Sequence, residues 1–172
     1  MVLTGCLASL VAGKTVRAES GFVCAEVMVV DVHGSGARAN EVSAPGLQLA
    51  DAMKKLWPEK RFTLASVPFP AAGGSLALAG AALKLPRGYH QSVVKMKGWL
   101  RERLRQIGRQ CPKALVFLTG YSQGAEAAGD VYQERAWPQV AGVALFGDPY
   151  FNYKDGSAKF GLNVRPRKRI KT

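Results

Sequence analysis

Histidine, cysteine and long apolar runs are scarce in this sequence. Its 172 residues include only two histidines and three cysteines. No run of about 18 apolar residues is present, which argues against a transmembrane helix. The chain also lacks a zinc-finger spacing, a Walker loop and an RNP-type aromatic strand, so we expect no specific nucleic-acid partner.

Basic residues, in contrast, are abundant. The 24 Lys and Arg outnumber the 12 Asp and Glu, which gives a net charge of +12. Many of them are grouped on a predicted helix or near the last residue: Arg101, Arg103, Arg105, Arg109, Arg165, Arg167, Lys168, Arg169 and Lys171. Either these charges form solvated surfaces and a loose tail, or they provide a weak contact with an anionic polymer or membrane surface.

The first twenty residues have the character of a secretory signal. Residues 2–13 are apolar and small, and Thr15-Val16-Arg17-Ala18 is similar to a signal-peptidase site. We therefore predict that residues 1–20 are the remnant of a signal peptide and that the protein is secreted. Two alternatives remain, a lipoprotein lipobox at Leu3–Cys6 and a first strand of the domain.

Strand-like and helix-like segments alternate through the middle of the chain. Continuous apolar runs predict buried strands at Val23–Val32, Phe62–Val67, Ala114–Thr119 and Val140–Phe146. Between them, helices are predicted after the Ser43 N-cap, over Tyr89–Ile107 and after residue 124. This order predicts an α/β three-layer sandwich, with an open, mostly parallel sheet of about four or five strands and helices on both faces. We assign residues 21–150 to this single domain and residues 151–172 to a basic tail.

The third predicted strand leads into Gly120-Tyr121-Ser122-Gln123-Gly124. A G-x-S-x-G sequence between a strand and a helix is typical of a nucleophile elbow, in which the serine occupies a strained turn. The residues two positions before and after the serine must then lack a Cβ, so that the strand and the helix can approach each other. The alternative is a glycine-rich turn with an incidental serine.

Two cysteines remain if Cys6 is removed with the signal. Cys24 and Cys111 each stand just before a predicted strand, and the starts of neighbouring parallel strands lie close together. A disulfide between them is therefore geometrically feasible in an oxidising compartment. Two buried free thiols are the alternative.

Several separated motifs, taken together, resemble the cutinase family over about residues 22–149. They are Cys24, Gly34-Ser35, Val67-Pro68-Phe69-Pro70-Ala71, Leu85-Pro86-Arg87-Gly88, Cys111-Pro112 and Gly120–Gly124. The resemblance implies a secreted serine esterase of the α/β-hydrolase fold, and we expect the protein to be a monomer. Such enzymes act on cutin, other polyesters, small esters and sometimes lipids, with no metal or other cofactor.

The resemblance also assigns roles to residues. Ser122 would be the nucleophile, and the backbone N–H of Gln123 would hold the oxyanion together with Ser35. Ser35 is equally suited to forming a turn. Cys24 and Cys111 would form the family's disulfide.

The chain departs from the family at the partners of the serine. Cutinases place their acid and histidine in the C-terminal segment, but this sequence has no histidine after His90 and no cysteine after Cys111. His33 and His90 are poor candidates for the base, because the histidine follows the nucleophile in this fold. Asp148 is a weak candidate for the acid, with a structural turn at the strand end as the alternative.

Two further hypotheses follow from that departure. The chain is expected to be a truncated cutinase, and a triad without its base retains only weak catalysis. It would then act at most as a cationic surface-binding module. A fragment that does not fold stably is the other hypothesis.

Overall fold

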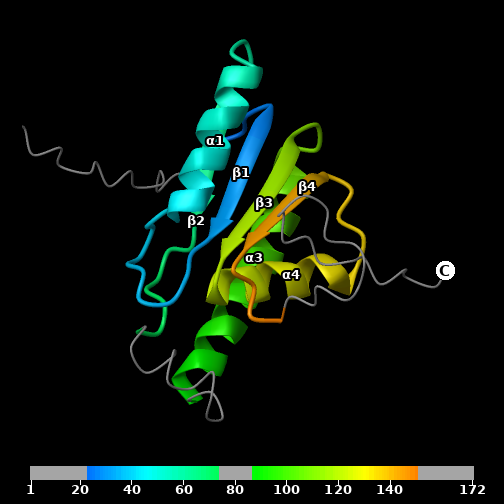
Figure 1. The fold of residues 1–172 in the computed structure, drawn as a ribbon. Helices are drawn as coiled ribbons and strands as arrows, with labels where there is room; N and C mark the ends of the chain where they lie inside the picture. Colours follow the sequence, from blue (N-terminus) through cyan, green and yellow to red (C-terminus); the bar gives the residue numbers. More distant parts are fainter. Residues whose placement is uncertain (1–22, 74–86, 151–172) are drawn as a thin grey trace, which may run out of the picture.

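A computed structural model describes residues 23–73 and 87–150 of the chain (Figure 1). The predicted signal remnant at 1–20 and the basic tail at 151–172 lie outside these residues, so both stay predictions. Neither described stretch contains a helix that is long and apolar enough to cross a membrane.

The core of the fold is a four-stranded parallel sheet. Its strands are β1 (Val27–Val32), β2 (Phe62–Ser66), β3 (Leu115–Tyr121) and β4 (Val140–Phe146), in the order β2-β1-β3-β4. The predicted open parallel sheet is confirmed. Because all strands run the same way, their carboxyl ends meet at one edge.

The first strand is four residues shorter than predicted. It begins at Val27 rather than Val23, because its partners begin at Phe62 and Leu115 and pair with Val27 in the first register position. The apolar residues before Val27 therefore have no neighbouring strand to join.

Helices cover both faces of the sheet, as predicted (Figure 1). Helix α1 (Ala44–Leu56) packs on one face, where Ala50 and Met53 meet Val27 and Val29. Ser43 is its N-cap, and the Ser43 Oγ accepts a hydrogen bond from the Gly46 N–H at 3.1 Å. The N-cap prediction is confirmed.

Helices α3 (Arg87–Gln110) and α4 (Gln123–Glu134) cover the other face. Along α3, four side chains at helical spacing are fully buried against the larger core: Met96, Leu100, Leu104 and Ile107. The helix extends beyond the predicted Tyr89–Ile107 at both ends. Each of α1, α3 and α4 connects two successive parallel strands.

A disulfide joins Cys24 to Cys111 at the amino edge of the sheet. The two Cα atoms are 5.7 Å apart, although the residues are 87 positions apart in the chain. Leu115 N–H donates to the Glu26 carbonyl at 2.9 Å, which brings the starts of β1 and β3 together. The expected pairing is confirmed.

Candidate functional site

Ser122 lies in the turn between β3 and α4, at the carboxyl edge of the sheet. Its φ of 51° and ψ of −116° are unusual for a residue with a side chain. Such a conformation persists only where surrounding contacts impose it. The Ser122 N–H donates to the Phe146 carbonyl at 2.8 Å, and its own carbonyl accepts from the Ala125 N–H at 2.9 Å. Ser122 is half-buried.

The glycines on either side of Ser122 are required by close backbone contacts. A Cβ on Gly124 would lie 1.9 Å from the Val32 carbonyl oxygen, and a Cβ on Gly120 would lie 2.7 Å from the Ala125 Cα. Both distances are far below an allowed contact. The strand, the strained serine and the helix therefore pack in the way expected of a nucleophile elbow.

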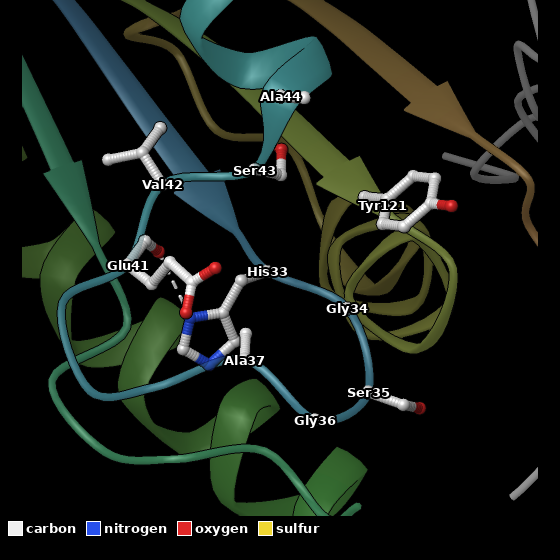
Figure 2. A pocket seen from close by; sticks show the side chains of 10 residues that line it. All are labelled: His33, Gly34, Ser35, Gly36, Ala37, Glu41, Val42, Ser43, Ala44 and Tyr121. Atoms are coloured by element: carbon white, nitrogen blue, oxygen red, sulfur yellow. Dashed lines mark hydrogen bonds between the residues drawn. The ribbon is translucent and has the colours of Figure 1, made fainter. Parts of the chain in front are cut away.

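The loop after β1 lies directly beside this turn. Val32 pairs with Gly120, and a Cβ on Gly34 would lie 2.7 Å from the Tyr121 ring. Ser35 follows at the next position and is half-buried. Figure 2 shows the Tyr121 ring beside this loop. The fold thus brings the Ser35 loop and the Ser122 turn to the same edge of the sheet.

The side chain of Gln123 is fully buried and bonded to α3. Its Nε2 donates to the Tyr89 carbonyl at 3.3 Å, and its Oε1 accepts from the Ser92 hydroxyl at 3.2 Å. Gln123 is also the first residue of α4, where a backbone N–H has no intrahelical acceptor. The group of Gln123 that suits an oxyanion is therefore its backbone N–H.

A cavity of about 240 Å³ lies beside these loops (Figure 2). Its wall is formed by His33–Ala37, Glu41–Ala44 and Tyr121. Among the residues of this wall, His33, Ser35, Ser43 and Glu41 are polar, while the alanines and Val42 are apolar. The cavity can therefore take a small group that is partly polar.

The family model described as Cutinase matches residues 23–170. The chain belongs to the cutinase family. It is 29% identical over 132 residues to Cutinase 4 of Emericella nidulans, covering 76% of this chain and 52% of that protein. It is also 27% identical over 166 residues to Cutinase CUT1 of Coprinopsis cinerea, covering 94% and 74% respectively. The cutinase-family chain thus spans about half the length of the first relative.

Solved structures support the same fold. An acetylxylan esterase superposes with a TM-score of 0.57 at 20% identity, over 76% of this chain and 67% of that structure. At this identity the similarity concerns the fold alone. The cutinase-family assignment and the α/β-hydrolase-like fold that the sequence predicts are both confirmed.

His33 is placed in the interior of this cutinase-family domain. It is 1% exposed, and its Nδ1 lies 3.1 Å from the Glu41 carbonyl oxygen. Burial lowers the pKa of the imidazole, and the Glu41 carbonyl opposes that shift. Figure 2 shows the ring between Glu41 and Ala37, while the Ser35 side chain points the other way. The ring therefore joins two loop segments.

The other sequence candidates lie at separate positions. His90 is exposed on α3. Asp148 follows β4 and is 6% exposed, and its Oδ1 accepts from the Tyr150 N–H at 3.0 Å. Its role as the acid stays a prediction. Within residues 23–73 and 87–150, no three His, Cys, Asp or Glu side chains are grouped to hold a metal ion.

One buried acid near the site was not singled out by the sequence. Asp31, in β1, accepts from the Ser43 N–H at 2.8 Å and from the Ser43 hydroxyl at 2.7 Å. Burial raises the pKa of Asp31 to about 6, although the Ser43 hydrogen bonds act in the opposite direction. The sequence signal that could have identified Asp31 is its position as an aspartate within an apolar predicted strand.

A second buried contact joins α3 to α4. The Tyr89 hydroxyl donates to the Glu126 Oε2 at 2.7 Å. Burial raises the pKa of Tyr89, and the Glu126 carboxylate adds to that shift. No sequence pattern predicts this pair, because its members are 37 positions apart.

Proposed function

We propose that this protein hydrolyses carboxylic esters, with Ser122 as the nucleophile. The observation that carries the proposal is the strained Ser122 turn between two glycines that the backbone packing requires. A half-buried serine in this position presents its Oγ at the carboxyl edge of the sheet. Membership of the cutinase family supports the same reaction.

In the proposed reaction, the Ser122 Oγ forms a bond to the ester carbonyl carbon and gives its proton to a base. The carbonyl oxygen becomes an oxyanion, which the Gln123 N–H and the Ser35 N–H and hydroxyl stabilise. Collapse of this intermediate expels the alcohol, which takes up the proton, and water then releases the acid from the acyl-enzyme. Neither histidine supports the role of base. His33 is buried with its Nδ1 at the Glu41 carbonyl, and His90 is exposed on α3.

Asp148 is the acid that we propose for orienting that base. It is buried two residues after the end of β4, the strand that neighbours β3. Because β3 and β4 are parallel, Asp148 and Ser122 both follow the carboxyl ends of their strands. Replacing Asp148 with Asn is expected to lower kcat by less than Ser122→Ala does, because Asp148 would act only through the group that takes the Ser122 proton. Equal kcat in the variant would remove Asp148 from the mechanism.

Short-chain esters and polyesters are the proposed substrates. The cavity beside the Ser35 loop holds about 240 Å³, which suits a small acyl or alcohol group. The similar proteins are named as cutinases and an acetylxylan esterase, and both names refer to ester hydrolysis. The Cys24–Cys111 disulfide supports a secreted location, since disulfides persist in oxidising compartments. We propose that the protein acts as a monomer.

The test compares hydrolysis of p-nitrophenyl butyrate by the full chain and by its Ser122→Ala variant. Ser122→Ala is expected to reduce kcat/KM to the uncatalysed background rate, because the nucleophile is removed. Thr63→Val is a matched control, because among the described residues the Thr63 Oγ1 has no hydrogen-bond partner. Thr63→Val should therefore keep the original rate. Equal rates for Ser122→Ala and the original chain would contradict the proposal.

A cationic surface-binding role is the second candidate. Residues 151–172 contain seven Lys and Arg but one Asp, so much of the +12 charge belongs to this segment. On α3, by contrast, Arg101 pairs with Glu134 and Lys97 pairs with Asp130. Binding to phosphatidylserine vesicles should weaken as salt rises, and truncation after residue 150 should abolish it. Binding that is unaffected by both changes would contradict this role.

A further inference from the structure

The Ser92 hydroxyl forms a contact between α3 and two segments of the proposed active site. Ser92 is 7% exposed. Its Oγ accepts from the Ala72 N–H at 3.2 Å and donates to the Gln123 Oε1 at 3.2 Å. A serine hydroxyl has one proton and two lone pairs, so it can form both hydrogen bonds at once.

The direction of these hydrogen bonds is fixed by a neighbouring carbonyl. The Gln123 Nε2 lies 3.3 Å from the Tyr89 carbonyl oxygen, which can only accept. The amide nitrogen of Gln123 must therefore face Tyr89, and the amide oxygen must face Ser92. The Ser92 proton is thus directed to Gln123, and its lone pair is left for the Ala72 N–H.

Ala72 in turn holds the loop that carries Ser35. The Gly36 N–H donates to the Ala72 carbonyl at 2.9 Å, and the Ala71 N–H donates to the Ala37 carbonyl at 3.0 Å. The segment 71–72 therefore pairs with the two residues that directly follow Ser35. A continuous path runs from Gly36 through Ala72 and Ser92 to Gln123.

We propose that Ser92 is a positioning residue that holds the two halves of the oxyanion site, Ser35 and Gln123, at a fixed separation. The inference rests on the proposed function of those two residues. An oxyanion is stabilised only when its donors are already 2.7 to 3.1 Å from the position that it will occupy. A small displacement of one donor therefore lowers the rate strongly while leaving substrate binding little changed. Ser92 acts through Ala72 and Gln123 and touches no reacting atom.

The kinetic test uses Ser92→Ala and Ser92→Thr in the full chain, with p-nitrophenyl butyrate as substrate. Ser92→Ala is expected to lower kcat by about 10- to 100-fold with KM within about twofold, because donor geometry matters mainly in the transition state. Ser92→Thr keeps the hydroxyl and should restore most of kcat. A rise in KM with unchanged kcat would overturn the proposal.

A double variant separates positioning from a general loss of packing. Gln123→Met removes the side-chain amide but keeps the backbone N–H that the proposal assigns to the oxyanion. If Ser92 acts through Gln123, the variant with both changes should have a kcat within about threefold of the slower single variant. Losses that multiply would show that the two residues act independently and would overturn the coupling. This comparison does not depend on the Thr variant folding.

Amide hydrogen exchange supplies a readout that is independent of catalysis. In Ser92→Ala, exchange at Ala72 and Gly36 should accelerate by about tenfold or more, while exchange at Val29 in the middle of β1 should not change. The Thr63→Val control should change neither. If Ser122→Ala and the original chain hydrolyse the ester equally, the proposed function fails, and exchange still decides the coupling. An unchanged exchange rate at the Gly36 amide in Ser92→Ala would overturn the proposal that Ser92 holds the Ser35 loop.

Discussion

The amino ends of the parallel strands form one edge of the sheet and their carboxyl ends form the other. These two edges are held together in different ways. At the amino edge, the Cys24–Cys111 disulfide joins the chain covalently, and the Lys60–Glu26 ion pair beside it is exposed. At the carboxyl edge, a strained Ser122 and a buried Asp31 are held only by hydrogen bonds and close packing. The contrast indicates that stability can be changed at the amino edge without disturbing the proposed chemistry.

The largest effect is expected from Gly124→Ala at the carboxyl edge. The added Cβ would lie 1.9 Å from the Val32 carbonyl oxygen, which belongs to the paired strand β1. Relief requires the strand or the helix to move, so we expect a loss of about 3 kcal/mol or more in the free energy of unfolding. Esterase activity should disappear. Urea unfolding followed by circular dichroism measures this loss of stability. An unchanged urea midpoint would show that the added Cβ does not clash with the Val32 carbonyl.

Removing the disulfide should lower stability at the amino edge while preserving activity. The bridge spans 87 positions, so Cys24→Ala with Cys111→Ala should lower the free energy of unfolding by about 2 to 5 kcal/mol. The rate of p-nitrophenyl butyrate hydrolysis at 20 °C should stay within about twofold. A folded variant that has lost its Ser122-dependent activity would show that the two edges are coupled.

Asp31→Asn tests the buried acid at the carboxyl edge through its pH dependence. The pKa of Asp31 is raised from 3.8 to about 6, so the folded state binds the proton more tightly than the unfolded state. The stability contributed by this carboxyl is therefore present at low pH and is lost as pH rises from about 4 to 6. By linkage the full change, from well below pH 4 to well above pH 6, amounts to about 3 kcal/mol.

The Asn variant cannot titrate at this position. Its stability relative to the original chain should therefore increase by about 2.5 kcal/mol between pH 4 and pH 7, whatever constant offset the altered Ser43 contact adds. Urea midpoints measured for both proteins across this range give the difference. A difference that stays constant with pH would show that Asp31 has an ordinary pKa.

The smallest effect, of opposite sign, is expected from Gly98→Ala. Gly98 is exposed in the middle of α3, and an added Cβ would meet no atom within 4 Å. Alanine favours a helix over glycine, so the free energy of unfolding should rise by about 0.5 to 1 kcal/mol. Because Gly98 and Gly124 both lie in helices, their thermal midpoints compare the same substitution with and without a backbone clash. Destabilisation by Gly98→Ala would contradict this account.

Most of the fold could be predicted from local sequence patterns. Val140–Phe146 is a strand at the predicted boundaries, because its apolar run ends at Gly147 and begins after Trp137-Pro138. The start of β1 was wrong by four residues, because pairing partners rather than hydropathy determine where a strand begins. The disulfide pairing came from the family resemblance and from the expected parallel strands.

The candidate site was predictable only where its residues are close in the sequence. Gly120, Ser122 and Gly124 lie within five consecutive positions, and their spacing alone predicts the backbone geometry of the turn. Asp31 with Ser43 and Ser92 with Gln123 are separated by 12 and 31 positions. Such hydrogen bonds depend on how the elements pack, and no local periodicity encodes that packing.

The contacts that require Gly120 and Gly124 involve only backbone atoms of Ala125, Gly124, Val32 and His33. They include no atom of the Ser122 side chain. Selection for folding alone would therefore preserve both glycines in a descendant that had exchanged this serine for alanine. In such a lineage the fold alone would keep the two glycines. Only the presence of the serine between them would indicate that the proposed reaction was kept.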